Sequence, residues 1–384
     1  MLYAVLKRLI MLFKLFPKYI LVLCVSALLA CNKKDIIPSH TVIVYMVAEN
    51  NLYSYAQSNI NHMEAGYTKG NLLVFYDNSD KTEILKISQD SNSEIVSEVV
   101  WSYDGEFNSV NPENMNMILT WIIDRYPADS YGLILWSHGC SWLPGTPQPK
   151  TKWFGQDLGN GDIRMDIQDF NRAIPGNTFD YIALDACFMG AVEVAWELRS
   201  KTDYLIAAPT EILANGFPYR DIVPVFFDAN PIREKTIRIA QLYYDYYASS
   251  SGTIGVYYLP EIEELAVKTK QLITSNAFTV WNYNANNVQV MDRPHVNGIG
   301  QNVMYDFVDF FEKNFSQSAV EPLKAQLDKM IIYKATTPKF LEITINTYCG
   351  ISAYLPKPAL TTTNNYYKTL SWTYASGYDK LLGL

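Results

Sequence analysis

The chain has 384 residues, of which 49% are hydrophobic and 18% are charged. This balance is typical of a folded protein and excludes a disordered one. The formal net charge is −8, and an acidic protein repels phosphate backbones, so no nucleic-acid partner is expected. The length suits one large domain or two modest ones.

The first thirty residues have the pattern of a targeting segment. Basic residues precede an apolar run that ends in SALLAC and is too short to span a membrane comfortably. This ending resembles the bacterial lipoprotein signal, which makes residues 1–30 a signal peptide and Cys31 a lipidated residue. An ordinary secretory signal with an incidental cysteine is the alternative. Translation from either Met1 or Met11 fits the pattern.

A short polar tether, residues 31–40, precedes a region in which apolar β-rich runs alternate with helical patterns. The expected strands are TVIVYMVA (41–48), NLLVFYDN (71–78), TEILKIS (82–88), YGLILW (131–136), FDYIALDA (179–186) and DYLIAA (203–208). The expected helices are 49–67, 112–127 and 190–200. This alternation predicts an α/β fold with a parallel sheet that helices cover on both faces.

The pattern loosens after about residue 217. The sequence predicts helices at 231–250 and 260–273, further helical patterns that cover 300–333, a strand at 253–259, and a β-hairpin or strand pair at 341–356. This half is expected either to complete the sheet or to form a smaller packed subdomain.

Two expected strands end in residues that suit nucleophilic catalysis. His138 and Gly139 follow YGLILW, and Cys187 follows YIALDA. The carboxyl ends of parallel strands share one edge of a sheet, so a thiol and an imidazole would meet there as a Cys–His pair. The helical pattern after Cys187 would favour its thiolate. The backbone N–H groups of Gly139 and Cys187 could form an oxyanion hole.

Each residue of the pair also has a structural alternative, because a lone cysteine is usually buried and a lone histidine usually packs or lies exposed. The other candidates are weaker. His40, His62 and His295 lie outside strand ends, Cys140 lacks the strand-to-helix context, and Cys349 is expected in the core. The cysteines after the signal form no CxxC pair, so neither a metal site nor a disulfide framework is assigned.

The stretches VYMVAENNLYSYA, YGLILWSHGCSW and YIALDACFMGAVEVAWEL together resemble the clostripain family of cysteine peptidases, from the same clan as caspases, gingipains and legumains. The resemblance covers about residues 41–225 and continues more weakly to the C-terminus. It implies a caspase-like α/β/α sandwich with a mostly parallel central sheet. One peptidase domain over 41–384 would have a C-terminal extension from about 226, and His138 and Cys187 would be its catalytic dyad.

The resemblance also implies that Asp185 lines the S1 pocket and holds a substrate Arg or Lys through charge-assisted bonds. A structural cap of the following helix is the alternative. Asn50 and Thr210 follow other strands at the same edge of the sheet and are expected as further pocket residues. The alternative is that they cap loops. Cys140 and Pro209-Thr210 depart from the residues usual in the family, which leaves the exact P1 preference open.

Relatives are made as precursors that are cut between the His and Cys strands. Lys150 and Lys152 lie in the Pro-rich stretch PGTPQPKTKWFGQD, so self-cleavage after Lys152 is expected. Several relatives depend on calcium, but Asp157 and Asp162 do not match an EF-hand loop. Calcium is therefore left open and without a location, and no organic cofactor is expected.

These observations predict a lipid-anchored cysteine endopeptidase of the bacterial cell envelope, periplasmic or surface-exposed, that cleaves protein or peptide substrates after Arg or Lys. The alternative is a non-catalytic surface binding lipoprotein on a peptidase-like fold, because fold alone does not confer function. A third reading keeps the dyad for another amide hydrolysis or for transpeptidation.

Overall fold

The computed structural model describes residues 40–143, 154–275, 283–295 and 299–384, all within the compact unit Ser39–Leu384. Cys31, Lys150 and Lys152 lie outside the described residues. Among the residues described, no helix has both the length and the apolar character needed to cross a bilayer.

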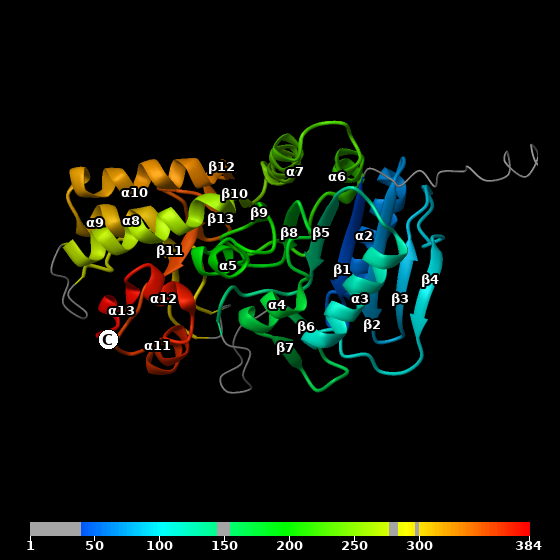
Figure 1. Cartoon of the computed structure of the whole chain (residues 1–384), viewed down its shortest axis with the longest axis horizontal. Helices are drawn as coiled ribbons and strands as arrows, with labels where there is room; N and C mark the ends of the chain where they lie inside the picture. The colour runs from blue at the N-terminus through cyan, green and yellow to red at the C-terminus, as the bar shows by residue number, and fades with distance from the viewer. Residues whose placement is uncertain (1–39, 144–153, 276–282, 296–298) are drawn as a thin grey trace, which may run out of the picture. The chain divides into compact units, whose positions relative to one another are not determined.

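A nine-stranded sheet runs through the unit in the order β12-β10-β9-β8-β5-β1-β2-β3-β4 (Figure 1). Its strands are β1 (Thr41–Val47), β2 (Asn71–Asn78), β3 (Lys81–Lys86), β4 (Glu98–Tyr103), β5 (Tyr131–Trp136), β8 (Tyr181–Asp185), β9 (Tyr204–Ala207), β10 (Thr253–Tyr258) and β12 (Ile331–Thr336). The central strands β2, β1, β5, β8 and β9 are parallel, and the outer strands pair antiparallel. The predicted mostly parallel sheet is confirmed.

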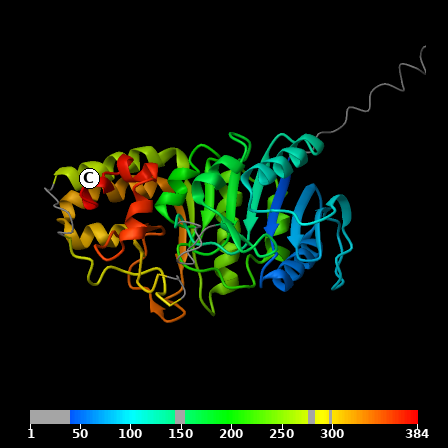
Figure 2. The same cartoon turned by 90° about the horizontal axis from the view of Figure 1, so that it is seen from below.

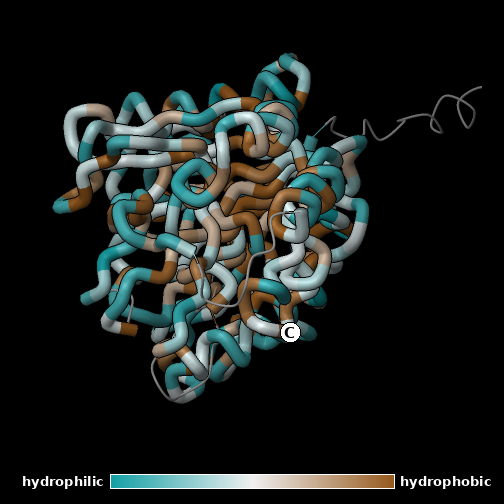
Figure 3. Tube along the Cα trace, turned by 90° about the vertical axis from the view of Figure 1, so that its left-hand side faces the viewer, coloured by the Kyte–Doolittle hydropathy of each residue, from teal (hydrophilic) through white to brown (hydrophobic). Residues whose placement is uncertain are grey.

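Helices cover both faces of the sheet (Figures 1 and 2). One face carries α2 (Tyr53–Gly66), α6 (Tyr219–Phe226) and α7 (Ile232–Tyr247), and the other carries α3 (Pro112–Arg125), α4 (Ile167–Ala173), α5 (Val192–Glu197) and α8 (Ile262–Ser275). Alternate residues of β1 therefore pack into two different hydrophobic cores. Ile43 and Tyr45 lie in one core, and Val42 and Val44 lie in the other. Hydrophobic segments accordingly gather in the central strands (Figure 3).

The C-terminal half completes the sheet through β10 and β12 and adds a helical layer beyond it. The remaining elements are β6 (Phe154–Asp157), β7 (Ile163–Met165), η1 (Leu259–Glu261), β11 (Met304–Asp306), α9 (Phe307–Asn314), α10 (Gln317–Met330), β13 (Lys339–Phe340), β14 (Ile343–Thr344), β15 (Ser352–Tyr354), α11 (Thr361–Tyr367), α12 (Ser371–Ala375) and α13 (Tyr378–Leu381). Of the two arrangements expected for this half, the chain therefore adopts the one in which it completes the sheet.

Three expectations about elements are wrong. The predicted strand pair at 341–356 does not pair with itself, because β14 pairs with β13 and β15 pairs with β11. The helical pattern over 300–333 ends at Met330, where β12 begins with Ile331 and Ile332, β-branched residues that favour strands. The helix expected from residue 190 starts only at Val192.

Candidate active site

The register of two parallel strands brings the predicted dyad to one edge of the sheet. Trp136 of β5 pairs with Asp185 of β8. His138 lies two residues after Trp136, and Cys187 lies two residues after Asp185. Both line one cavity of about 150 Å³. This is smaller than the roughly 300–1,000 Å³ of small-molecule sites, and it suits a single side chain.

Gly139 packs directly against the loop that carries the thiol. A Cβ at position 139 would lie 2.7 Å from the Cβ of Ala186 and 3.2 Å from the backbone nitrogen of Cys187. Only glycine therefore allows this approach. The backbone of Gly139 therefore packs against the amide of Cys187, and the oxyanion hole at these two residues stays a prediction.

The imidazole of His138 is half-buried and meets a partner that the sequence analysis did not name. Its Nε2 lies 2.6 Å from Oδ1 of Asn51. An amide oxygen only accepts, so with this oxygen facing the ring the imidazole carries its proton on Nε2 and leaves Nδ1 as the basic nitrogen. Burial, and then the positive charge of Arg164, lower the pKa of His138 to about 4. The ring is therefore neutral at neutral pH.

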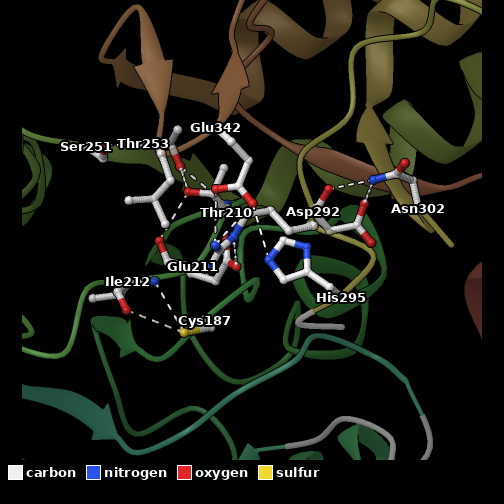
Figure 4. Close-up of polar contacts among 12 residues, drawn as sticks. Cys187, Thr210, Glu211, Ile212, Ser251, Thr253, Asp292, His295, Asn302 and Glu342 are labelled. Atoms are coloured by element: carbon white, nitrogen blue, oxygen red, sulfur yellow. Dashed lines mark hydrogen bonds and ion pairs between the residues drawn. The ribbon is translucent and has the colours of Figure 1, made fainter. Parts of the chain in front are cut away.

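The sulfur of Cys187 lies against the loop after β9 (Figure 4). It accepts from the N–H of Ile212 at 3.4 Å and donates to the Ile212 carbonyl at 3.5 Å. The prediction that a helix N-terminus lies next to the thiol is wrong. The chain turns at Phe188 with a φ of 62°, and α5 begins only at Val192. The helix N-terminus is thus separated from the sulfur by a turn.

Asp185 lies in the same cavity, as the resemblance implied. It is 3% exposed, and burial raises its pKa to about 7. Both hydrogen bonds that it accepts from described residues go to Oδ2, from the N–H of Phe217 at 3.0 Å and the hydroxyl of Tyr219 at 2.8 Å. Oδ1 is therefore the oxygen that is left for a ligand in the cavity.

Glycine is also required opposite this carboxylate. Gly216 has a φ of +66°, and a Cβ there would lie 2.7 Å from Oδ2 of Asp185. The rest of the wall is mainly apolar, with Leu52, Ile212 and Leu213. An apolar wall that ends in a buried carboxylate fits a long aliphatic side chain with a cationic end.

The structure does not support Asn50 and Thr210 as pocket residues, and their positions match the capping alternative. The amide nitrogen of Asn50 donates to the carbonyls of Val47 and Gln156, and its oxygen accepts from the N–H of Leu52. Thr210 is fully buried, and its hydroxyl bonds with that of Thr253 at 2.8 Å (Figure 4). Both side chains are occupied in holding loops rather than in facing the cavity.

The rival histidines and cysteines lie elsewhere. Cys140 and Cys349 are buried, and burial holds the pKa of Cys349 well above its usual value. His40 is buried beside Ser130, and His295 is exposed beside Glu342 (Figure 4). The sequence analysis missed Asn51, and only its position one residue after Asn50 could have pointed to it.

A further group of side chains gathers near this edge. One carboxylate oxygen from each of Glu49, Glu106 and Asp157 lies within 4.8 Å of the others. Asp162, which was considered for calcium together with Asp157, instead pairs with Arg164 at 2.9 Å. The three clustered carboxylates are the candidates to hold a cation in the described part of the chain.

Comparison with known proteins gives consistent matches. The sequence profile described as the clostripain family matches residues 44–383. Clostripain from Hathewaya histolytica is 24% identical over 220 residues, which are 47% of this chain and 41% of clostripain. The chain thus matches less than half the length of that curated relative.

Solved structures match over nearly their whole length. The inactive zymogen of a C11 protease from Parabacteroides distasonis is 32% identical, with a TM-score of 0.78, over 88% of this chain and 98% of that one. A secreted C11 cysteine protease from Bacteroides thetaiotaomicron, in complex with an irreversible peptide inhibitor, is 30% identical, with a TM-score of 0.75. The match covers 89% of this chain and 100% of that one.

Proposed function

The chain belongs to the clostripain family of cysteine-type endopeptidases, as its sequence predicted, and from that premise we propose that it is an exported, lipid-anchored enzyme that cleaves proteins after Arg or Lys. Its fold is the caspase-like α/β/α sandwich of that family. The dyad is His138 and Cys187, and Asp185 selects the residue before the cleaved bond.

The geometry supports a four-step reaction. Nδ1 of His138 takes the thiol proton of Cys187 while Asn51 accepts from Nε2–H and so steadies the imidazolium. The thiolate attacks the carbonyl carbon, and the amides of Gly139 and Cys187 stabilise the oxyanion. The imidazolium protonates the departing amine, and water then hydrolyses the acyl-enzyme with the imidazole as base.

The single observation that carries the specificity is the buried carboxylate of Asp185 in the cavity that the thiol also lines. A substrate guanidinium or ammonium would pair with Oδ1, and its methylene groups would pack on Leu52 and Leu213. Pairing in a water-poor site is stronger than on the surface.

The test is an assay of residues 32–384 on peptides with Arg, Lys, Asp or Ala before the cleaved bond. Cleavage after Arg and Lys that Cys187→Ala abolishes is the expected result. Retained cleavage in Cys187→Ala would refute the dyad. Equal cleavage after Asp or Ala would refute the role of Asp185 but keep the dyad. No cleavage by the wild type, even after nicking near Lys152, would favour a binding lipoprotein.

Activation by self-cleavage after Lys152 is supported by the sequence of the 144–153 stretch and by the solved relative, which is an inactive zymogen. Mass spectrometry of purified protein should find a new N-terminus at Trp153 in the wild type and none in Cys187→Ala. An uncut wild-type chain with full activity would contradict this step.

Lipid anchoring at Cys31 is supported by the SALLAC sequence, and export by the secreted relative. Fractionation of cells should place the wild type with membranes and Cys31→Ser in the soluble envelope fraction or the medium. A membrane-bound Cys31→Ser protein would contradict lipidation at this residue.

A further inference from the structure

An ion pair joins the C-terminal half of the chain to the loop that touches the thiol. Glu211 lies in the loop between β9 and α6, and Arg293 lies between α8 and β11. Nε of Arg293 donates to Oε1 of Glu211 at 2.8 Å, and the two side chains are only 18% and 8% exposed. Charge-assisted hydrogen bonds that are largely shielded from water are strong and little screened by salt. The pair therefore fixes the carboxylate end of Glu211.

Glu211 directly precedes the residue that meets the sulfur. Ile212 donates its N–H to Sγ of Cys187 at 3.4 Å, and its carbonyl accepts from the thiol at 3.5 Å (Figure 4). On the other side of Glu211, the carbonyl of Thr210 accepts from the N–H of Phe188 at 2.8 Å. Ile212 also belongs to the apolar wall of the cavity. A movement of Glu211 would therefore move backbone that contacts the thiol.

Arg293 extends from a fixed segment of the C-terminal half. The carboxylate of the preceding residue, Asp292, is fully buried. It accepts from the N–H of Val303 at 3.0 Å and from the side-chain amide of Asn302 at 3.1 Å (Figure 4). These bonds hold the backbone from which the guanidinium reaches the loop after β9.

The same guanidinium also meets an exposed carboxylate. Nη1 of Arg293 lies 3.2 Å from Oε2 of Glu342, whose side chain is 52% exposed. His295 lies 3.4 Å from the other oxygen of that carboxylate (Figure 4). Exposed ion pairs contribute little to stability. Loss of Glu342 would take a charge from the same guanidinium and leave its buried bond to Glu211, so the chain offers a matched control.

We propose that Arg293 is a positioning residue for the cysteine peptidase reaction. Through its bond to Glu211 it holds the N–H of Ile212 at the sulfur of Cys187. An N–H that donates to sulfur favours the thiolate, which is the form that attacks. In a chain without the guanidinium, the buried charge of Glu211 would lose its cation, turn toward water and carry Ile212 away from the thiol. This role rests on Cys187 as the proposed nucleophile, although its first test needs no peptidase activity.

The first measurement is the rate at which iodoacetamide alkylates Cys187 in the detergent-solubilised full chain, followed by mass spectrometry over a range of pH. The dependence on pH reports the thiolate fraction, and the plateau at high pH reports access to the sulfur. In Arg293→Gln the profile should move to higher pH, so that the rate at neutral pH, relative to the plateau, falls about threefold or more. Glu342→Gln should leave the profile unchanged.

Two further results connect the effect to Glu211. In the double variant Arg293→Gln, Glu211→Gln the buried charge is gone and two amides can bond with each other, so the alkylation profile should return toward that of the wild type. On peptides that the wild type cleaves, Arg293→Gln should lower kcat/KM about tenfold or more, mainly through kcat. If the wild type cleaves no peptide, the proposed function fails while the alkylation test still decides the role of Arg293.

An unchanged alkylation profile in folded Arg293→Gln would overturn the proposal. A double variant no closer to the wild type than Arg293→Gln, or an equal shift in Glu342→Gln, would also overturn it, because the effect would then not run through the buried bond. If circular dichroism shows that Arg293→Gln is unfolded, Glu211→Ala takes its place, since it removes the other end of the same bond. A profile moved to higher pH is again the expected result, and an unchanged profile the contrary one.

Discussion

At the scale of single residues, the imidazole of His138, the proposed catalytic base, contacts a side chain that is one position away from a predicted pocket residue. Asn51 faces His138, whereas Asn50 turns inward to hold the loop. Their order in the sequence does not reveal this, because the backbone turn after β1 decides which amide faces the cavity. In the proposed reaction Asn51 is a positioning residue, since it would act on the substrate only through His138.

Replacement of Asn51 should therefore affect the reaction rather than binding. Asn51→Ala should lower kcat about tenfold or more with little change in KM, because the Nε2–H loses its acceptor and the imidazolium its stabilisation. Asn51→Asp keeps an acceptor and should restore most of kcat. Asn61→Ala, which removes a half-buried amide on α2 that bonds to the Ser93 carbonyl and not to His138, serves as the matched control. An unchanged kcat in folded Asn51→Ala would show that the contact is incidental.

The buried carboxylate of Asp185 predicts a pH dependence with a defined sign. Its pKa in the free protein is raised to about 7, so it takes up a proton as the pH falls through 7 and no longer attracts a cationic side chain. The pKa of His138, lowered to about 4, cannot cause a loss in this range. We expect kcat/KM for Arg substrates to fall below about pH 7, since this ratio reports the free enzyme.

Asp185→Asn provides the check on this assignment. The variant should lose the acid limb near pH 7, and at pH 8 its kcat/KM for Arg substrates should fall about tenfold to hundredfold, the equivalent of a charged hydrogen bond. An Ala substrate cleaved by the wild type should lack the limb. If kcat/KM falls below about pH 7 in the same way in Asp185→Asn and in the wild type, a group other than Asp185 causes the fall.

At the scale of elements, strand ends could be predicted from the sequence more reliably than helix starts. The apolar runs before His138 and Cys187 are β5 and β8, and their register brings the two proposed catalytic residues to one edge of the sheet. The start of α5 was misplaced, because apolar residues after Cys187 have helical spacing although the chain first turns at Phe188 with positive φ. Tertiary contacts, which no local pattern contains, decide this turn.

The short helix α5, which follows β8, is joined to the C-terminal segment through Glu193. This buried carboxylate accepts from the N–H of Tyr354 at 2.9 Å and from the hydroxyl of Tyr367 at 2.8 Å. Glu193→Ala should lower the free energy of unfolding by about 2–4 kcal/mol, because two buried donors lose their acceptor and a cavity forms. Urea denaturation measures this change.

Two further variants make the Glu193 result specific. Glu193→Gln keeps one acceptor oxygen and should lose less stability than Glu193→Ala, whereas Glu234→Ala, in the exposed first turn of α7, should change stability little. A loss in Glu193→Ala no larger than that in Glu234→Ala would mean that this carboxylate does not join the two segments.

At the scale of the whole unit, the sequence left open how the C-terminal half is arranged. Strand β10 extends the sheet antiparallel to β9, and β12 pairs antiparallel with β10, so the half that looked weakly patterned contributes to both cores. Such pairings join residues far apart in the chain, such as Val256 with Tyr333. A single sequence read by local periodicity carries no signal for them.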